Sequence, residues 1–277
     1  MHPATHWNEV EALQKTCEQH DGIALKLNWD TLLSRKPNDG NDLAEYRDGK
    51  LVAFLGRYPF GSTMEVCGMV HPDYRRQGIF AGLLQRAMDD PAILPYSKLL
   101  LNAPGNSESA KKFLARVSCV FSFTEYQMCH AADSGLPASP GPAVTLRDAL
   151  KDDLPLLAEL DHEGFRIDAD ETRLYYEEMS AEEIAKHELI VVSGEPVGKI
   201  RVARRDGESW IYGFVVLARH RGQGIGSTTL HQIIERERAA GYEVWLEVAL
   251  DNAHAKKLYE NAGFQVRRSQ DYYAYLR

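Results

Sequence analysis

The stretch VVLARHRGQGIGSTTL, residues 215–230, decides which fold this chain is expected to adopt. It begins as an apolar strand, passes through a loop in which Gly222, Gly224 and Gly226 alternate with other residues, and continues with the apolar spacing of a helix. Between a strand and a helix, such a loop favours anions, because backbone N–H groups and the helix dipole converge there. Glycine also lets a phosphate approach where a Cβ would clash.

Two well-known phosphate loops do not fit this stretch. A nucleoside triphosphate loop needs a lysine before its Ser or Thr, whereas Ser227 follows Gly226 directly. A dinucleotide fingerprint needs G-x-G-x-x-G in a parallel βαβ unit, whereas the spacing here is G-x-G-x-G after strands that are joined by short turns. A tight loop that only turns the chain stays open as an alternative.

Composition limits the class of protein. The chain has 277 residues and a net charge of −8, which argues against a general nucleic-acid binder. Its four cysteines form no C-x-x-C pair, so no metal site is expected. The N-terminus lacks the basic start and apolar core of a signal peptide, and no apolar run could span a bilayer. We expect a cytoplasmic protein, monomeric or homodimeric, with no membrane partner.

The order of expected elements repeats along the chain. Arg75 and Arg221 open similar loops and lie 146 positions apart, and a segment rich in Pro, Gly and Ser lies near mid-chain. We therefore expect two domains, 1–133 and 144–277, joined by a linker at 134–143. The alternation of strands and helices predicts a mixed α/β fold of the α+β class. The second half is expected to contain strands at 143–150, 188–193, 197–205, 209–217 and 242–250, a strand or hairpin at 264–276, and helices at 151–165, 173–188, 225–241 and 252–262.

Two motifs of the second half resemble those of the GNAT superfamily of N-acyltransferases. Arg221, Gly224 and Gly226 match its R/Q-x-x-G-x-G/A loop. The stretch LEVALDNAHAKKLYENAGF resembles the next motif of the superfamily, and the likeness extends over residues 144–277. The first half matches less well, because Phe80 replaces the last glycine of the loop.

The resemblance implies two tandem domains, each with a mostly antiparallel sheet, flanking helices and a splayed slot for CoA. It also implies acetyl-CoA or another acyl-CoA as co-substrate, with the pyrophosphate on the N–H groups of residues 222–227. Gly213 is expected to mark the bulge that opens the slot. The expected cofactor-binding residues are Val215, Val216, Leu217, Arg221, Gly222, Gln223, Gly224, Ile225, Gly226, Ser227 and Asn252.

Acyl transfer to an amine needs a base, an oxyanion donor and an acid for the leaving thiolate. Glu247 is the expected base, since a carboxylate within a buried strand needs a partner or a task; a water relay or a bond to local backbone is the alternative. The N–H of Val216 or Leu217 is the expected oxyanion donor. Tyr259 stands where the superfamily commonly carries its acid, although it also lies on an apolar helix face.

The acceptor is expected near the first helices of the second half, where Glu163, Tyr175 and Tyr176 lie among many carboxylates. These residues favour a cationic small-molecule amine, and a solvated acidic helix face is the alternative. A non-catalytic CoA-responsive module and acetylation of a protein or peptide N-terminus also stay open. The first half is expected to bind CoA poorly, because Phe80 crowds its loop and Phe113 or Leu114 replaces the tyrosine.

Overall fold

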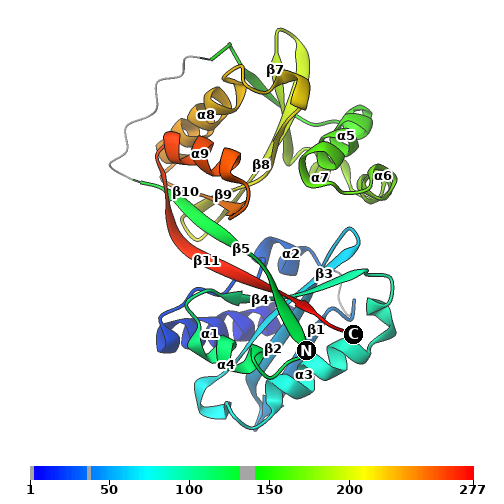
Figure 1. Cartoon of the computed structure of the whole chain (residues 1–277), viewed down its shortest axis with the longest axis vertical. Coiled ribbons are helices and arrows are strands. Elements are labelled where there is room, and N and C mark those ends of the chain that lie inside the picture. Colours follow the sequence, from blue (N-terminus) through cyan, green and yellow to red (C-terminus); the bar gives the residue numbers. More distant parts are fainter. Residues whose placement is uncertain (1–2, 36–38, 132–140) are drawn as a thin grey trace. The chain divides into compact units, whose positions relative to one another are not determined.

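The computed structural model describes residues 3–35, 39–131 and 141–277. Contacts among the residues divide the chain into two compact units. Unit 1 consists of Met1–Glu125 together with Arg268–Arg277, and unit 2 consists of Tyr126–Arg267. Each unit contains a mostly antiparallel sheet with helices on its two faces, which confirms the expected α+β class (Figure 1).

The sheet of unit 1 has the strand order β1-β2-β3-β4-β11-β5. The pairs β1–β2, β2–β3 and β4–β11 are antiparallel, whereas β3 and β4 are parallel and need the crossover that contains α3. The strands are β1 (Asp42–Arg47), β2 (Lys50–Phe60), β3 (Thr63–Val70), β4 (Lys98–Pro104), β5 (Cys119–His130) and β11 (Phe264–Tyr275), the last two shared with unit 2. The helices are α1 (Pro3–Asp21), α2 (Trp29–Ser34), α3 (Ile79–Asp89) and α4 (Glu108–Leu114), with short 3-10 turns at Pro72–Tyr74 and Pro91–Ile93.

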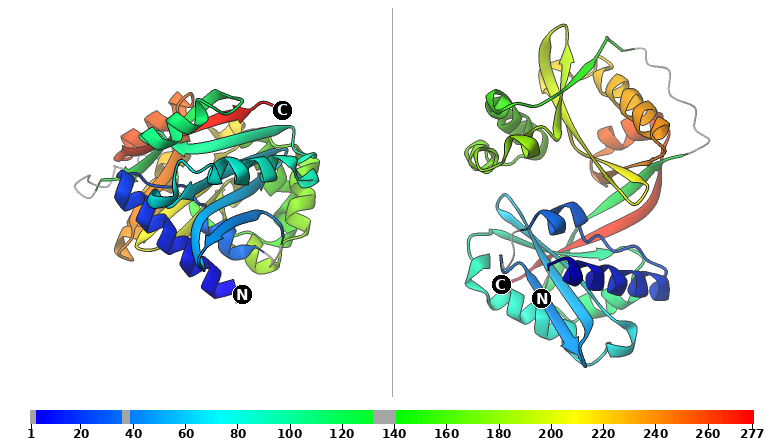
Figure 2. Two further views of the ribbon diagram at one scale, coloured as in Figure 1. Left: turned by 90° about the horizontal axis from the view of Figure 1, so that it is seen from below. Right: turned by 180° about the vertical axis from the view of Figure 1, so that it is seen from behind.

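Apolar layers cover both faces of this sheet. Leu13 of α1 packs in one layer with Phe54, and Figure 2 shows α1 along that face. Leu83 of α3 packs in the other layer with Leu55. Successive residues of β2 thus point into opposite layers, and for this reason the strand is buried from Leu51 to Tyr58 instead of alternating with polar residues.

The sheet of unit 2 has the order β11-β5-β10-β9-β8-β7-β6. The pairs β6–β7, β7–β8 and β8–β9 are antiparallel, and β9–β10 is parallel with α8 in its crossover. The strands are β6 (Thr145–Asp148), β7 (His187–Val192), β8 (Glu195–Arg205), β9 (Glu208–Val216) and β10 (Glu243–Ala249). The helices are α5 (Leu154–Phe165), α6 (Ala169–Glu177), α7 (Ala181–Ile184), α8 (Ile225–Ala239) and α9 (Ala253–Asn261), with 3-10 turns at Lys151–Asp153 and Ala218–His220.

The helices of unit 2 form one group on each face of its sheet (Figure 1). Ile233 of α8 and Tyr259 of α9 share an apolar layer with Leu246 of β10. Leu160 of α5 shares the opposite layer with Val215 of β9. We call these two sides the α8 face and the α5 face.

The units divide the chain differently from the expected domains, 1–133 and 144–277. Gln270 to Ala274 of β11 pair with Pro104 to Leu100 of β4, so the end of the chain completes the sheet of the first half. A sequence repeat does not reveal this exchange, because it is a pairing between distant segments. The expected linker, 134–143, lies outside the described residues up to position 140.

The stretch expected as one helix at 173–188 contains two helices and the start of a strand. α6 ends at Glu177, and Ser180 begins α7 with a capping box in which its hydroxyl accepts a hydrogen bond from the Glu183 N–H at 3.2 Å. The Glu183 carboxylate accepts in return from the Ser180 N–H at 2.9 Å. Such a box starts a new helix because it satisfies two N–H groups at once.

Candidate active site

A slot lies between two parallel strands of unit 2. β9 and β10 pair from Glu208 with Glu243 to Ile211 with Leu246, and the described structure gives no later pair between them. β9 nevertheless continues to Val216 and β10 to Ala249. We call the space between these unpaired ends the slot, because their backbone groups are left for another partner.

A β-bulge in β9 lies at the start of the slot. Arg201 of β8 pairs with Tyr212, and Lys199 pairs with Val215, so β9 contains one residue more than β8 between these pairs. Gly213 is in this extra length, and its φ of 56° lies in the left-handed region that favours glycine. The bulge expected at Gly213 is therefore confirmed.

The glycine loop joins the end of β9 to α8. Gly222 and Gly224 have φ values of 78° and 81°, and Gly224 is the N-cap of α8. The first N–H groups of a helix have no acceptor within it, so those of Ile225, Gly226 and Ser227 point out of the helix start. Together with the helix dipole, this arrangement suits an anion.

Arg221 fixes the strand end beneath the loop. Its Nε donates to the carbonyl oxygen of Val216 at 2.8 Å, and its Nη2 lies 4.0 Å from Oε1 of Glu163. The same Glu163 oxygen accepts a hydrogen bond from the Ala218 N–H at 2.8 Å. Arg221 and Glu163 thus hold the passage from β9 into the loop from two sides.

Hydrogen bonds of β9 distinguish the two expected oxyanion donors. The N–H of Leu217 donates to the carbonyl oxygen of Val197 at 2.9 Å, so it is engaged with β8. Neighbouring N–H groups of a strand point to opposite edges. The N–H of Val216 therefore points away from β8, toward the slot.

Tyr259 lies in the apolar layer of the α8 face. It is 8% exposed, and its ring contacts Phe264 edge-on with 6.1 Å between the ring centroids. Burial raises the pKa of its hydroxyl to about 12, so the group is protonated at neutral pH. It is therefore a core aromatic whose hydroxyl carries a proton.

Glu247 lies on the opposite side of β10. Its neighbours Leu246 and Val248 belong to the apolar layer of the α8 face, so Glu247 points to the α5 face. It is partly exposed, and its Oε1 accepts a hydrogen bond from Nε2 of Gln127 at 2.9 Å. The expected acid and base thus lie on different faces of the sheet.

The remaining expected cofactor residues take several positions. The side chains of Val215, Leu217 and Ile225 are buried, so these residues can offer only backbone groups. Asn252 is the N-cap of α9, and its side chain accepts a hydrogen bond from the Ala255 N–H at 3.1 Å. This cap explains an asparagine here without any ligand. Gln223 is exposed on the loop.

The three residues expected to bind the acceptor do not form one surface. Glu163 is engaged at the end of β9, as described above. Tyr176 is 2% exposed and donates to Asp161 Oδ2 at 2.7 Å, whereas Tyr175 is 63% exposed. The three residues lie in one acidic stretch of sequence, but adjacent helix residues such as Tyr175 and Tyr176 point in different directions, so one is exposed and the other is buried.

A buried ion pair that the sequence analysis did not identify lies next to the bulge. Lys199 Nζ lies 2.5 Å from Asp161 Oδ1 and donates to the Tyr176 hydroxyl at 2.9 Å, which ties β8 to α5 and α6. Burial lowers the pKa of Lys199, and burial together with Asp161 raises that of Tyr176. The signal in the sequence was a lysine between apolar neighbours, in the stretch VGKI at 197–200.

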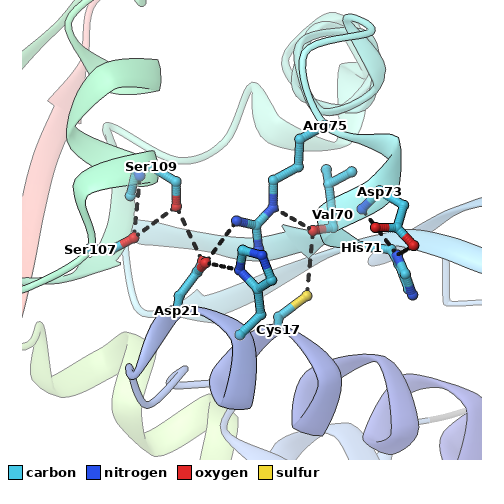
Figure 3. Close-up of polar contacts among 10 residues, drawn as sticks. Cys17, Asp21, Val70, His71, Asp73, Arg75, Ser107 and Ser109 are labelled. Carbon is cyan, nitrogen blue, oxygen red and sulfur yellow. Dashed lines mark hydrogen bonds and ion pairs between the residues drawn. The ribbon is translucent and has the colours of Figure 1, made fainter.

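Unit 1 repeats the slot and the arginine contacts of unit 2 at its own glycine loop. β3 and β4 pair only from Thr63 with Lys98 to Val66 with Leu101. Figure 3 shows Arg75 between Val70 and Asp21: its Nε donates to the Val70 carbonyl oxygen at 3.0 Å, and its Nη1 donates to Asp21 Oδ1 at 2.9 Å. These bonds correspond to those of Arg221 in unit 2, with Asp21 in the role of Glu163.

The loop backbone of unit 1 also keeps its shape. Gly78 is the N-cap of α3 with a φ of 77°, and Arg76 has a φ of 64° where unit 2 has Gly222. An arginine in the left-handed region is strained. Because the strained shape is kept, the loop geometry is a property of the fold and does not depend on glycine at every position.

Phe80 does not point into the mouth of this loop. Its ring lies so close to Gly68 of β3 that a Cβ there would be 2.8 Å from Phe80 Cε2, and it packs on Phe113 with 5.1 Å between centroids. In unit 2 the phenylalanine and the glycine are exchanged: the strand residue is Phe214 of β9, and it lies beside Gly226 of the loop. Phe80 therefore packs between helix and sheet and does not crowd the loop as the sequence suggested.

A segment of unit 1 crosses the face of its own slot. The Lys26 carbonyl oxygen accepts a hydrogen bond from Cys67 Sγ on β3 at 3.0 Å. The Ala24 carbonyl oxygen accepts from Gln270 Nε2 on β11 at 3.2 Å, and β4 lies between these two strands. Residues 24–26 thus lie across the unpaired strand ends.

Two negative findings concern the described part of the chain. No helix there is long and apolar enough to cross a membrane. Within the same residues, no group of three or more His, Cys, Asp or Glu side chains is placed to hold a metal ion.

Comparison with known proteins identifies the architecture of this site. Residues 147–264 match the family model described as acetyltransferase (GNAT) family. The sequence matches none of the curated proteins with which it was compared.

Several solved structures share the fold of both halves. The GCN5-related N-acetyltransferase from Sphaerobacter thermophilus has 21% identity and a TM-score of 0.70, with 96% of this chain and 91% of that chain covered. A GNAT-family acetyltransferase from Colwellia psychrerythraea has 14% identity and a TM-score of 0.66, with 97% of each chain covered. The tandem GNAT protein from the clavulanic acid biosynthesis pathway has 16% identity and a TM-score of 0.67, with 96% of this chain and 93% of that chain covered. At such identities the likeness shows the fold, which is that of tandem GNAT domains.

Proposed function

Since residues 147–264 form a domain of the acetyltransferase (GNAT) family, we propose that unit 2 transfers an acetyl group from acetyl-CoA to a primary amine of a small molecule. The observation that carries this proposal is the slot between β9 and β10, which opens beside the N-terminus of α8 with Glu247 at its edge.

Acetyl-CoA would lie in the slot. Its pyrophosphate would accept hydrogen bonds from the N–H groups of residues 222–227, and its pantetheine arm would follow the edge of Val215 to Leu217 that faces away from β8. Arg221 and Glu163 would hold that strand end in place. The arginine would therefore support the phosphate site through the backbone as well as through its charge.

The chemistry would follow from groups on both sides of the slot. Glu247 on the α5 face would accept a proton from the ammonium, directly or through water, and the neutral amine would attack the thioester carbon. The Val216 N–H would stabilise the tetrahedral oxyanion. Tyr259 on the α8 face would protonate the thiolate as the C–S bond breaks, and it would be restored by the proton that the attacking nitrogen loses as the amide forms.

Unit 1 would have a structural role and would neither bind CoA nor turn over. Residues 24–26 cross its slot, and neither Phe113 nor Leu114 offers a proton at the position that matches Tyr259. Binding of acetyl-CoA measured by calorimetry should therefore give one molecule per chain. A stoichiometry of two would contradict this part of the proposal.

The test of the activity is thiol release from acetyl-CoA with a panel of amines. We expect release with the wild type, a loss of at least about a hundredfold with Tyr259→Phe, and little acetyl-CoA binding by Gly224→Trp. Binding of acetyl-CoA without release for any amine would support a non-catalytic CoA-responsive module instead. Turnover of peptide N-termini alone would replace the small-molecule acceptor.

A further inference from the structure

Gln127 and Glu247 form a paired polar site on the α5 face of unit 2. Gln127 lies on β5 between Tyr126 and Met128, whose side chains pack in the α8 face layer, so it points to the same side as Glu247. Gln127 is 5% exposed, and its Nε2 donates to Glu247. Because a carboxylate only accepts, the amide nitrogen must face it and the amide oxygen must face away.

The amide oxygen of Gln127 needs a hydrogen-bond donor. It is buried, and the described residues provide it with none. A buried carbonyl oxygen without a partner costs free energy, so its retention calls for an explanation. The bond from Gln127 Nε2 to Glu247 Oε1 supplies that explanation, since a glutamine held in the core fixes the carboxylate beside the slot.

Three aromatic side chains lie beside this pair on the same face of the sheet. Trp210 of β9 pairs in register with Trp245 of β10, and their rings stack with 5.4 Å between centroids. Tyr212, two residues beyond Trp210 on the same face, stacks on it at 6.4 Å. Glu247 is likewise two residues beyond Trp245. Tyr212 on β9 and Glu247 on β10 therefore lie on opposite sides of the slot, on the same face of the sheet.

A positive charge ends this stack on the side away from Glu247. Arg201 of β8 is the register partner of Tyr212, and its guanidinium carbon lies 5.0 Å from the centre of that ring. At the other end of the stack, Trp210 Nε1 donates to Glu208 Oε2 at 2.8 Å, so the rings lie between two charged groups and suit a flat apolar body.

We infer that Glu247, held in place by Gln127, receives the amine of the acceptor and that Trp210 and Tyr212 receive its body. The acceptor class is thus a primary amine joined by a short chain to an aromatic or other flat apolar body, which narrows the cationic small-molecule amine expected from the sequence. This inference rests on the proposed acetyl transfer. Gln127 is then a positioning residue, which orients the base through its amide N–H.

The test compares phenylethylamine, ethylamine and spermidine as acceptors, with release of CoA as the readout. We expect the wild type to prefer phenylethylamine over both other amines by at least about tenfold in kcat/KM. Trp210→Ala should reduce the preference for phenylethylamine over ethylamine by about tenfold, a ratio that a general loss of folded protein would not change.

Gln127→Leu should raise the KM for phenylethylamine at least about tenfold and leave the KM for acetyl-CoA within about twofold. The matched control is Gln270→Leu in unit 1, because Gln270 is also buried with an amide oxygen that has no partner among the described residues. The control should retain both KM values.

The outcomes separate this inference from the activity itself. If no amine causes release of CoA, the proposed function fails and the inference with it. If amines react but spermidine is preferred, or if Trp210→Ala and Gln127→Leu leave acceptor kinetics as in the wild type, only the inference is overturned.

Discussion

The three glycines of the loop are expected to respond differently to replacement by alanine, although they are spaced by only two residues. Gly222 has a φ of 78°, and no atom lies within 4 Å of the position its Cβ would take. Gly222→Ala should therefore lower the free energy of unfolding only through the strain of a left-handed alanine. We expect a loss of about 1 kcal/mol, because the lower entropy of the unfolded chain offsets part of this strain.

Gly224→Ala adds a steric cost to the same backbone strain. Its new Cβ would lie 3.0 Å from the Cα of Gly141, a backbone atom that cannot rotate away. Overpacking of this kind costs about 1–3 kcal/mol, so we expect a total loss of about 2–4 kcal/mol in the free energy of unfolding.

Gly226→Ala should be close to neutral. Gly226 lies in the first turn of α8 without a positive φ, and the contact at 3.3 Å is with Leu258 Cδ2, the tip of a flexible side chain. Helix propensity favours alanine there by up to about 1 kcal/mol, which offsets the tight contact.

Urea unfolding of the three variants at one pH, followed by tryptophan fluorescence, measures these differences. The expected order of stability is Gly226→Ala, then Gly222→Ala, then Gly224→Ala. Equal losses for Gly222→Ala and Gly224→Ala would show that the approach of Gly141 is not what distinguishes them. No loss in either variant would refute the left-handed loop itself.

Four further changes test other parts of the structure. Arg76→Gly should raise the free energy of unfolding by up to about 1 kcal/mol, since it relieves left-handed strain; a loss in urea unfolding would contradict this. Lys199→Met should lower it by about 3–5 kcal/mol because Asp161 is left buried and charged, and Asp161→Asn in the same chain should recover much of the loss in a double-mutant cycle. Burial, with smaller effects of nearby cations, lowers the pKa of His187 to about 3, so between about pH 6.5 and 3 only the unfolded chain takes up this proton. The free energy of unfolding should therefore decrease as the pH is lowered through this range, by up to about 1.4 kcal/mol per pH unit. His187→Phe should make this decrease smaller. Tyr259→Phe should leave the acetyl-CoA dissociation constant within about twofold of the wild type while release of CoA slows, and an equal loss in both would mean that the hydroxyl serves structure alone.

Several parts of the site could be predicted from local sequence. The order of strands and helices in the second half, the glycine loop and the bulge at Gly213 follow from turn chemistry and from apolar periodicity, which act over a few residues. The repeat at an offset of 146 also predicted the matching loop at Arg75, which the structure contains with the same hydrogen bond to a strand carbonyl.

Other parts depend on contacts between distant segments. Whether Phe80 fills a loop or a helix–sheet layer depends on Gly68, twelve residues away on a neighbouring element. Glu163 lies in a helix whose composition suggested an acceptor surface, yet its carboxylate is engaged by the Ala218 N–H. No pattern within either segment specifies these partners.

By itself, the sequence determined that the chain holds two related α+β halves and that residues 221–226 form a loop suited to an anion, because glycine conformation and strand–helix order are local properties. Only the tertiary structure decided that the last strand enters the sheet of the first half and that Gln127 meets Glu247, 120 residues away. Strand pairing joins segments regardless of their separation along the chain, and therefore the residues that surround the slot could be identified only once the strand order was known.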